Sequence, residues 1–205
     1  MTGPSARRGY TIVELMIAIS VMAIGITGII SMQKVTLVAN QHAKNLSIAT
    51  QIASAWLDAL SADALQWNNP GRTSNSTDLP QTRWLNNVND TWFRPAYDAT
   101  LAFGPAFDAL GNPVDESAVS AGRAVYCTHL RLSWLFPETG NLFGMPVNGN
   151  GLIRAEVRVF WLREGGPGAA GVACAASTAP ADISPAVATY HFVYQTGGIR
   201  QNSVW

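Results

Sequence analysis

This sequence is poor in charge and in the residues that most enzymes use for chemistry. Charged residues make up 13% of the 205 residues, and 13 Lys and Arg balance 13 Asp and Glu. A net charge of zero argues against a nucleic-acid-binding protein, which normally has an excess of Lys and Arg. There are three histidines and two cysteines, and no H-E-x-x-H, G-x-S-x-G or Cys/His cluster. We therefore predict that the chain is not an enzyme and binds no cofactor and no metal.

Proline is missing from a long stretch near the N-terminus, between Pro4 and Pro70. In the second half of this stretch, apolar residues recur every three or four positions, as on one face of an α-helix. Gln51, Asp58 and Asp63 are expected to lie off that stripe. The recurring residues are Leu46, Ala49, Ala53, Trp56, Leu60 and Ala64. A stop signal, Asn-Asn-Pro-Gly, follows at residues 68–71. We predict one helix from about Tyr10 to Trp67.

The first half of this predicted helix is almost free of polar residues. The run from Leu15 to Met32 contains no charge, and its polar residues are Ser20, Thr27 and Ser31. As a helix the run is about 27 Å long, close to the roughly 30 Å hydrocarbon core of a bilayer. Arg7 and Arg8 precede it and would hold the N-terminus in the cytoplasm. We predict a single membrane-spanning helix, with the rest of the chain on the periplasmic side.

Two ordinary interpretations of such a segment are a secretory signal peptide and a simple membrane anchor. The run is longer than the usual signal-peptide core of about 7–15 residues, and no clear small-residue cleavage site follows it. Neither interpretation accounts for Glu14, a carboxylate set directly against the apolar run. A charge in a membrane-spanning helix costs free energy, so such a residue is interpreted as functional by default.

Both cysteines, Cys127 and Cys174, lie beyond the apolar run. The periplasm and the cell exterior are oxidising, so we predict a disulfide between them; a free reactive thiol is the alternative. A bridge over a loop of this length stabilises the fold by about 4 kcal/mol in the chain-entropy model.

Strand signals occupy the C-terminal part of the chain. Residues 126–134, 152–162 and 187–194 alternate with period two, as half-buried antiparallel strands do. In the second segment one set of side chains is apolar, and the opposite set is predicted to form a solvent-exposed face with cross-strand partners. The apolar set is Ala155, Val157, Val159 and Trp161, and the opposite set is Arg154, Glu156 and Arg158. We predict an α+β fold, in which a long N-terminal helix packs on a small C-terminal antiparallel sheet.

Other residue types that often bind ligands are expected to be structural here. The acidic residues of the middle segment lack EF-hand spacing and are interpreted as turn residues rather than a calcium site: Asp98, Asp108, Asp115 and Glu116. The scattered histidines are interpreted as structural or surface residues: His42, His129 and His191. The tryptophans are expected in the core or at subunit contacts rather than in a sugar-binding platform: Trp84, Trp92, Trp134, Trp161 and Trp205.

The N-terminal residues carry a family resemblance. The segment R-R-G-Y-T-I-V-E-L-M at residues 7–16, followed by the apolar run, resembles the class III signal of type IV prepilins. In that family a membrane peptidase cleaves after the glycine and then methylates the new N-terminal amine. The resemblance, which covers about the first thirty residues, implies that cleavage follows Gly9 and that Tyr10 becomes the methylated N-terminus. It also implies that Glu14 is the family's signature glutamate, with a role in subunit docking. Family N-termini are most often Phe, so Tyr10 is a mild departure.

The physical chemistry of this site agrees with the resemblance. Cleavage would create an ammonium on Tyr10, one helical turn from Glu14 of the same or a neighbouring subunit. In a low-dielectric environment the ammonium and the carboxylate attract each other, but much of that energy offsets their desolvation. The main effect of the pair is therefore to fix the position of one subunit relative to the next, more than to add net stability.

The predicted division of the chain is a cleaved leader (1–9), a transmembrane or filament-core helix (10–33), its amphipathic continuation (34–67) and a loop-rich globular β domain (68–205).

Two shorter matches refine the resemblance. Residues 22–28, M-A-I-G-I-T-G, resemble a pattern of PilV-type minor pilins and the related GspI-type minor pseudopilins, and residues 157–161, V-R-V-F-W, are similar to a strand of the PilV group. They imply a minor pilin in a complex that primes assembly of a type IV pilus and sits at its tip. The implied partners are the prepilin peptidase, other minor pilins, the major pilin, a tip adhesin and the inner membrane, with no nucleic acid. The implied location is the inner membrane, and then the pilus at the cell surface.

The sequence is also compatible with two functions other than that of a minor pilin. One is a minor pseudopilin of a type II secretion system, which has the same N-terminal signal. The other belongs to a different class, a membrane-anchored extracellular binding module or adhesin whose Trp-rich loops contact a ligand.

Overall fold

The computed structural model describes residues 10–67, 79–137, 139–142, 145–148, 151–163, 174 and 189–201. Contacts divide the chain into two compact units, residues 1–45 and 46–205. The predicted helix stop at residues 68–71 lies outside the described residues.

The first unit consists of the beginning of helix α1 (Ile12–Trp67). The helix starts two residues later than predicted and ends where predicted, and neither Gly25 nor Gly28 interrupts it. An 18-residue window with a mean hydropathy of 2.3 makes it long and apolar enough to cross a membrane. None of that window is buried against other parts of the chain, so its apolar surface is available to lipid or to other subunits.

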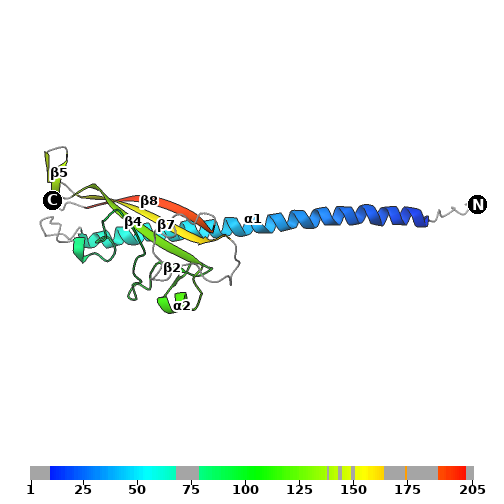
Figure 1. Ribbon diagram of the computed structural model, residues 1–205, viewed down its shortest axis with the longest axis horizontal. Helices are drawn as coiled ribbons and strands as arrows, with labels where there is room; N and C mark the ends of the chain where they lie inside the picture. Colours follow the sequence, from blue (N-terminus) through cyan, green and yellow to red (C-terminus); the bar gives the residue numbers. More distant parts are fainter. Residues whose placement is uncertain are drawn as a thin grey trace, which may run out of the picture. The chain divides into compact units, whose positions relative to one another are not determined.

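The second unit combines the end of α1 with an antiparallel sheet, and the second half of α1 lies along that sheet (Figure 1). The sheet has the order β3-β2-β4-β7-β8, and β1 also pairs with β4. A separate hairpin is formed by β5 (Thr139–Leu142) and β6 (Met145–Asn148). The strands of the sheet are β1 (Trp92–Phe93), β2 (Ala106–Phe107), β3 (Pro113–Val114), β4 (Tyr126–Phe136), β7 (Leu152–Leu162) and β8 (Tyr190–Arg200). The short helices η1 (Leu79–Gln81) and α2 (Glu116–Ser120) lie in the connections. The predicted α+β architecture is confirmed.

The three long strands follow the period-two pattern of the sequence. β4 and β7 occupy the predicted segments, and a β-bulge between Trp134 and Phe136 ends the regular register of β4. β8 extends to Arg200, six residues further than predicted. Gly197 and Gly198 break the strand pattern in the sequence, whereas pairing with β7 fixes them in the structure.

The main core lies between α1 and one face of the sheet. Ile153, Ala155, Val157, Val159 and Trp161 of β7 are all buried there, which confirms the apolar face predicted for this strand. Trp56 of α1 is fully buried, with its ring 5.2 Å from that of Trp84. A Cβ on Gly197 would meet the Leu57 side chain at 3.0 Å, so a glycine lets the helix approach β8 closely.

The core also contains a carboxylate, Asp63, which was predicted to lie off the apolar stripe of the helix. Asp63 is 6% exposed, and its position three residues after Leu60 places it on the buried face of α1, so that prediction is wrong. Its Oδ1 accepts a hydrogen bond from the Arg83 amide at 2.8 Å, and its Oδ2 accepts from the amides of Trp84 (2.8 Å) and Leu85 (3.1 Å). The segment after η1 supplies three donors to one carboxylate, and these compensate its burial.

A second apolar cluster lies around the disulfide between Cys127 and Cys174. Both cysteines are buried among Ala106, Phe160 and Tyr190. The bridge ties Cys174, the one described residue between 164 and 188, to β4.

The acidic residues of the middle segment stabilise turns by accepting hydrogen bonds from backbone amides, as expected. Asp98 accepts from the amides of Thr100 and Leu101, and Asp115 caps α2 by accepting from the Ala118 amide at 2.8 Å. Backbone hydrogen bonds lower the pKa of both carboxyls, because they favour the charged form. Among the described residues no group of three or more His, Cys, Asp or Glu is arranged to hold a metal ion.

Candidate functional site

The residues of the predicted processing signal that the structure describes lie at the start of α1. Thr11 directly precedes the helix, and its Oγ1 accepts a hydrogen bond from the Glu14 amide at 3.3 Å. Its carbonyl accepts from the Leu15 amide at 3.2 Å. Thr11 is thus the N-cap, and Glu14 occupies the third helical position, the spacing of a capping box. Thr11 was not among the predicted site residues, although the T-x-x-E pattern at residues 11–14 is typical of a helix N-terminus.

The position of Glu14 also has an electrostatic consequence. It is the acidic residue of the first turn of α1, where the unpaired amides give the helix a partial positive charge. A carboxylate there is stabilised by the helix itself, and the side chains of Tyr10 and Glu14 are both exposed in the isolated chain. Both side chains are therefore accessible to a second molecule.

The apolar part of α1 satisfies its own polar groups. The hydroxyls of Ser20, Thr27 and Ser31 each donate to a helix carbonyl three or four residues earlier, at 2.8–2.9 Å. Since lipid supplies no hydrogen-bond partners, this internal bonding suits the helix to a membrane or a filament core.

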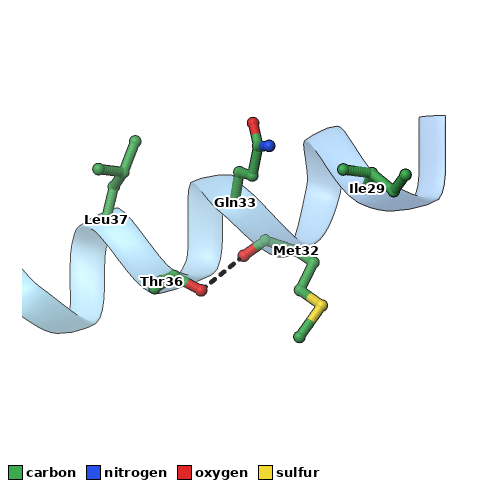
Figure 2. A pocket seen from close by; sticks show the side chains of 5 residues that line it. All are labelled: Ile29, Met32, Gln33, Thr36 and Leu37. Carbon is green, nitrogen blue, oxygen red and sulfur yellow. Dashed lines mark hydrogen bonds between the residues drawn. The ribbon is translucent and has the colours of Figure 1, made fainter. Parts of the chain in front are cut away.

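The same bonding continues further along the helix, where Thr36 donates to the Met32 carbonyl at 3.0 Å (Figure 2). The side chains of Ile29, Met32, Gln33, Thr36 and Leu37 project from successive turns of one helix (Figure 2). They form the side of a helix rather than a cavity that encloses a ligand.

A buried polar cluster lies on the face of the sheet that points away from α1. His129 of β4 is directly opposite Arg158 of β7, and Arg158 Nη2 lies 2.9 Å from His129 Nδ1. Because a guanidinium only donates, Nδ1 is the unprotonated, accepting nitrogen. The Trp92 ring covers Arg158, whose guanidinium carbon is 4.4 Å from the ring centroid. Tyr194 of β8 is the cross-strand partner of Arg158 on the other side.

The burial of this cluster corrects the exposed face predicted for β7. Arg158 is 0% exposed, so the prediction is wrong for this residue. Trp92 comes from a segment some sixty residues earlier in the chain, and its stacking over the guanidinium could not be seen in the periodicity of β7. Glu156 does have the expected cross-strand partner, in a salt bridge with Arg131.

The cluster keeps its histidine neutral. Burial, together with the neighbouring Arg158 and Arg94 guanidinium groups, lowers the pKa of His129 from 6.5 to about 3. The unfolded chain therefore binds a proton between about pH 6.5 and pH 3 that the folded chain does not. The resulting contribution to stability is complete above pH 6.5 and is lost as the pH falls.

We expect the free energy of unfolding of the full chain in detergent to fall by up to about 1.4 kcal/mol per pH unit below pH 6 on account of His129. Denaturant titrations from about pH 7 to about pH 4.5 measure this above the range in which most carboxyls titrate. His129→Leu should flatten this slope, even if it lowers the overall stability. His42→Leu, at an exposed position of α1, is the matched control and should keep the slope. An unchanged slope in His129→Leu would contradict the prediction.

Some of the other predicted residues lie outside the described part of the chain, and the rest are packed against other side chains. Arg7, Arg8 and Gly9 lie outside the described residues. The tryptophans Trp84 and Trp161 are buried in the core, and Trp92 covers Arg158, so these three form no open aromatic platform. Trp205 lies outside the described residues.

Comparison with known proteins bears on the N-terminal segment. Residues 4–30 match the family model of the prokaryotic N-terminal methylation motif. No curated protein and no solved structure matches the chain significantly. The motif is a substrate signal for a prepilin peptidase and implies pilin-type partners, and with the apolar helix it fits an inner-membrane anchor. Together with the α+β architecture, it supports a type IV pilin-like or pseudopilin protein and indicates a structural role rather than an enzymatic one.

Proposed function

We propose that this chain is a minor pilin that joins other minor pilins in a complex priming type IV pilus assembly at the pilus tip. The observation that carries the proposal is the register at the start of α1. Tyr10 and the N-cap Thr11 directly precede α1, Glu14 lies in its first turn, and the helix then stays apolar and unbroken through the length of a bilayer. The segments 22–28 and 157–161 support the PilV-type assignment through their resemblance to that group.

In this proposal the precursor is held in the inner membrane by α1, with the sheet in the periplasm. The prepilin peptidase cleaves after Gly9 and methylates the amine of Tyr10. A new ammonium at this end of α1 faces the positive end of the helix dipole, which is unfavourable. Glu14, in the same first turn, offers the compensating charge within its own chain or to a neighbouring subunit.

The partners of the mature protein would be other minor pilins, the major pilin and a tip adhesin. The neighbouring pilins would pack against the apolar surface of α1 that is exposed in the isolated chain. The disulfide between Cys127 and Cys174 agrees with a periplasmic or extracellular location. The adhesin alternative is less well supported, because Trp84 and Trp161 are buried and unavailable to a ligand.

The processing step is tested directly by mass spectrometry of the protein purified from membranes. We expect the mature chain to begin at Tyr10 and to carry one methyl group on its amine. A chain that keeps Met1, or that is cut beyond the apolar run, would contradict the proposal.

A second measurement separates a pilus from a secretion pseudopilus. A strain lacking this protein should lose surface pili, and the wild-type protein should be found in sheared filaments. Normal piliation with a loss of folded secreted proteins would instead identify a type II secretion pseudopilin.

A further inference from the structure

Two buried nitrogen atoms near the centre of β4 lack a hydrogen-bond partner. His129 is 0% exposed, and its Nε2 has no partner among the described residues. The side chain of Arg94, which directly follows β1, is 11% exposed, and its Nε is likewise shielded from solvent and without a partner in the described part of the chain. Burying a donor without an acceptor is costly, so folded proteins nearly always supply one. The two atoms therefore indicate an acceptor that the described residues do not provide.

The register of the strands brings these two residues together. β1 pairs with β4 in antiparallel orientation, and Phe93 lies opposite Leu130 in that pairing. Both of these side chains pack in the main core, on the face toward α1. The next pair in the same register is Arg94 and His129, whose side chains lie on the opposite face because successive residues of a strand alternate. Burial, Arg158 and Arg94 together lower the pKa of His129, so the Arg94 guanidinium is close enough to act on the imidazole.

The hydrogen bonds already formed in this cluster identify both atoms as donors. His129 Nδ1 accepts from Arg158 Nη2 at 2.9 Å, so the neutral imidazole carries its proton on Nε2. Every nitrogen of a guanidinium group donates and none accepts. Glu116 of α2 forms a salt bridge with Nη2 of Arg94, which is a different nitrogen from the buried Nε. The missing partner must therefore accept a hydrogen bond from each of the two donors.

The surroundings of the two donors favour an anion over a water molecule. The charged groups that act on His129 are the guanidinium groups of Arg94 and Arg158, and both are positive. A water molecule that accepts two hydrogen bonds still has two protons to donate. Here the imidazole Nδ1 is already occupied by Arg158, and the Phe160 ring, 4.9 Å from the imidazole, is apolar. A halide ion has no proton to donate, and its charge is attracted by both guanidinium groups.

We propose that a small monovalent anion of the size of chloride binds between His129 Nε2 and Arg94 Nε and accepts a hydrogen bond from each. The ion ties the segment after β1 to the centre of β4. The salt bridge between Arg94 and Glu116 then connects α2 to the same segment. The proposal rests on the sheet alone, so it stands or falls independently of the N-terminal processing signal.

The test observes His129 Nε2 itself, by NMR of the full chain in detergent with nitrogen-15 in its histidines. At neutral pH, sodium chloride replaces sodium gluconate at constant ionic strength, because the gluconate ion is too large for a buried site between two side chains. We expect a saturable change in the resonance of His129 Nε2, since chloride becomes its hydrogen-bond acceptor. His42, at an exposed position of α1, is the internal control and should not change. Bromide, which has the same charge and a similar size, should compete with chloride.

Variants of the protein make the test specific for this site. Arg94→Gln removes one donor and one positive charge, so it should weaken chloride binding at least about tenfold. Arg200→Gln removes the same charge at an exposed position of β8 and is the matched control. It should bind chloride within about twofold of wild type, because an exposed charge is screened by solvent and salt. The titration of the wild-type chain decides the question even if Arg94→Gln does not fold.

Three outcomes would overturn the proposal. One is a His129 Nε2 resonance that chloride leaves unchanged, which would show that water or another part of the chain is the acceptor. Another is a change that grows in proportion to the chloride concentration without saturating, which would be a general effect of the salt. The third is equal chloride affinity of the wild-type chain and a folded Arg94→Gln variant, which would place the ion elsewhere.

Discussion

A chain carrying Glu14→Leu should be cleaved normally after Gly9 and yet enter filaments about a hundredfold less often than wild type. Under the proposed function, Glu14 neutralises the Tyr10 ammonium when the subunit docks. Without the carboxylate, the ammonium is left unpaired in a low-dielectric interface. Breaking a buried pair in this way costs on the order of 3–5 kcal/mol, which corresponds to at least a hundredfold in an equilibrium constant. The measurement is the amount of this protein in sheared filaments from a strain with the variant as its only copy.

Two further variants separate charge pairing from helix capping. Glu14→Gln keeps the shape of the side chain and removes its charge, so it should behave like Glu14→Leu. Thr11→Ala removes the N-cap oxygen that accepts the Glu14 amide and keeps the carboxylate. It should cost only about 1 kcal/mol of helix stability and reduce incorporation less than tenfold. Normal incorporation of Glu14→Leu would reject the docking role and favour a membrane-anchored binding module.

The second large effect is expected at Asp63. Asp63→Ala should destabilise the sheet-containing unit by about 3 kcal/mol or more, because it leaves the amides of Arg83, Trp84 and Leu85 without their acceptor. Each buried donor left unsatisfied costs about 1–3 kcal/mol. Denaturant unfolding of the full chain in detergent, followed by tryptophan fluorescence, measures the loss. Trp84 packs on Trp56 beside these amides, so its signal reports the same region.

The chain offers a close control for this experiment. Asp58 lies on the same helix and is exposed, so Asp58→Ala should change stability by less than about 0.5 kcal/mol. Asp63→Asn keeps one accepting oxygen and should give an intermediate loss. Equal effects of Asp58→Ala and Asp63→Ala would show that the three hydrogen bonds contribute little.

The features that depend on residues close together in the chain could be predicted from the sequence alone. The span of α1 follows from the absence of proline and from the three- and four-residue spacing of its apolar residues. β4 and β7 follow from strict alternation, and the pairing of Cys127 with Cys174 follows from there being only two cysteines in an oxidising compartment. The N-terminal signal was equally local, because glycine, an aromatic residue, glutamate and an apolar helix fall in one register. Such patterns are decided by neighbours along the chain, which the sequence displays directly.

The remaining features depended on residues distant in the chain, and only the tertiary structure decided them. The three amides that compensate the burial of the Asp63 carboxylate come from a segment some twenty residues away. Arg158 is buried because Trp92, from a two-residue strand on the other side of β4, lies over it. β8 reaches Arg200 because β7 pairs with two glycines that the strand pattern disfavours. Periodicity assigns a side chain to a face of its own element, but burial and pairing depend on what the fold brings against that face.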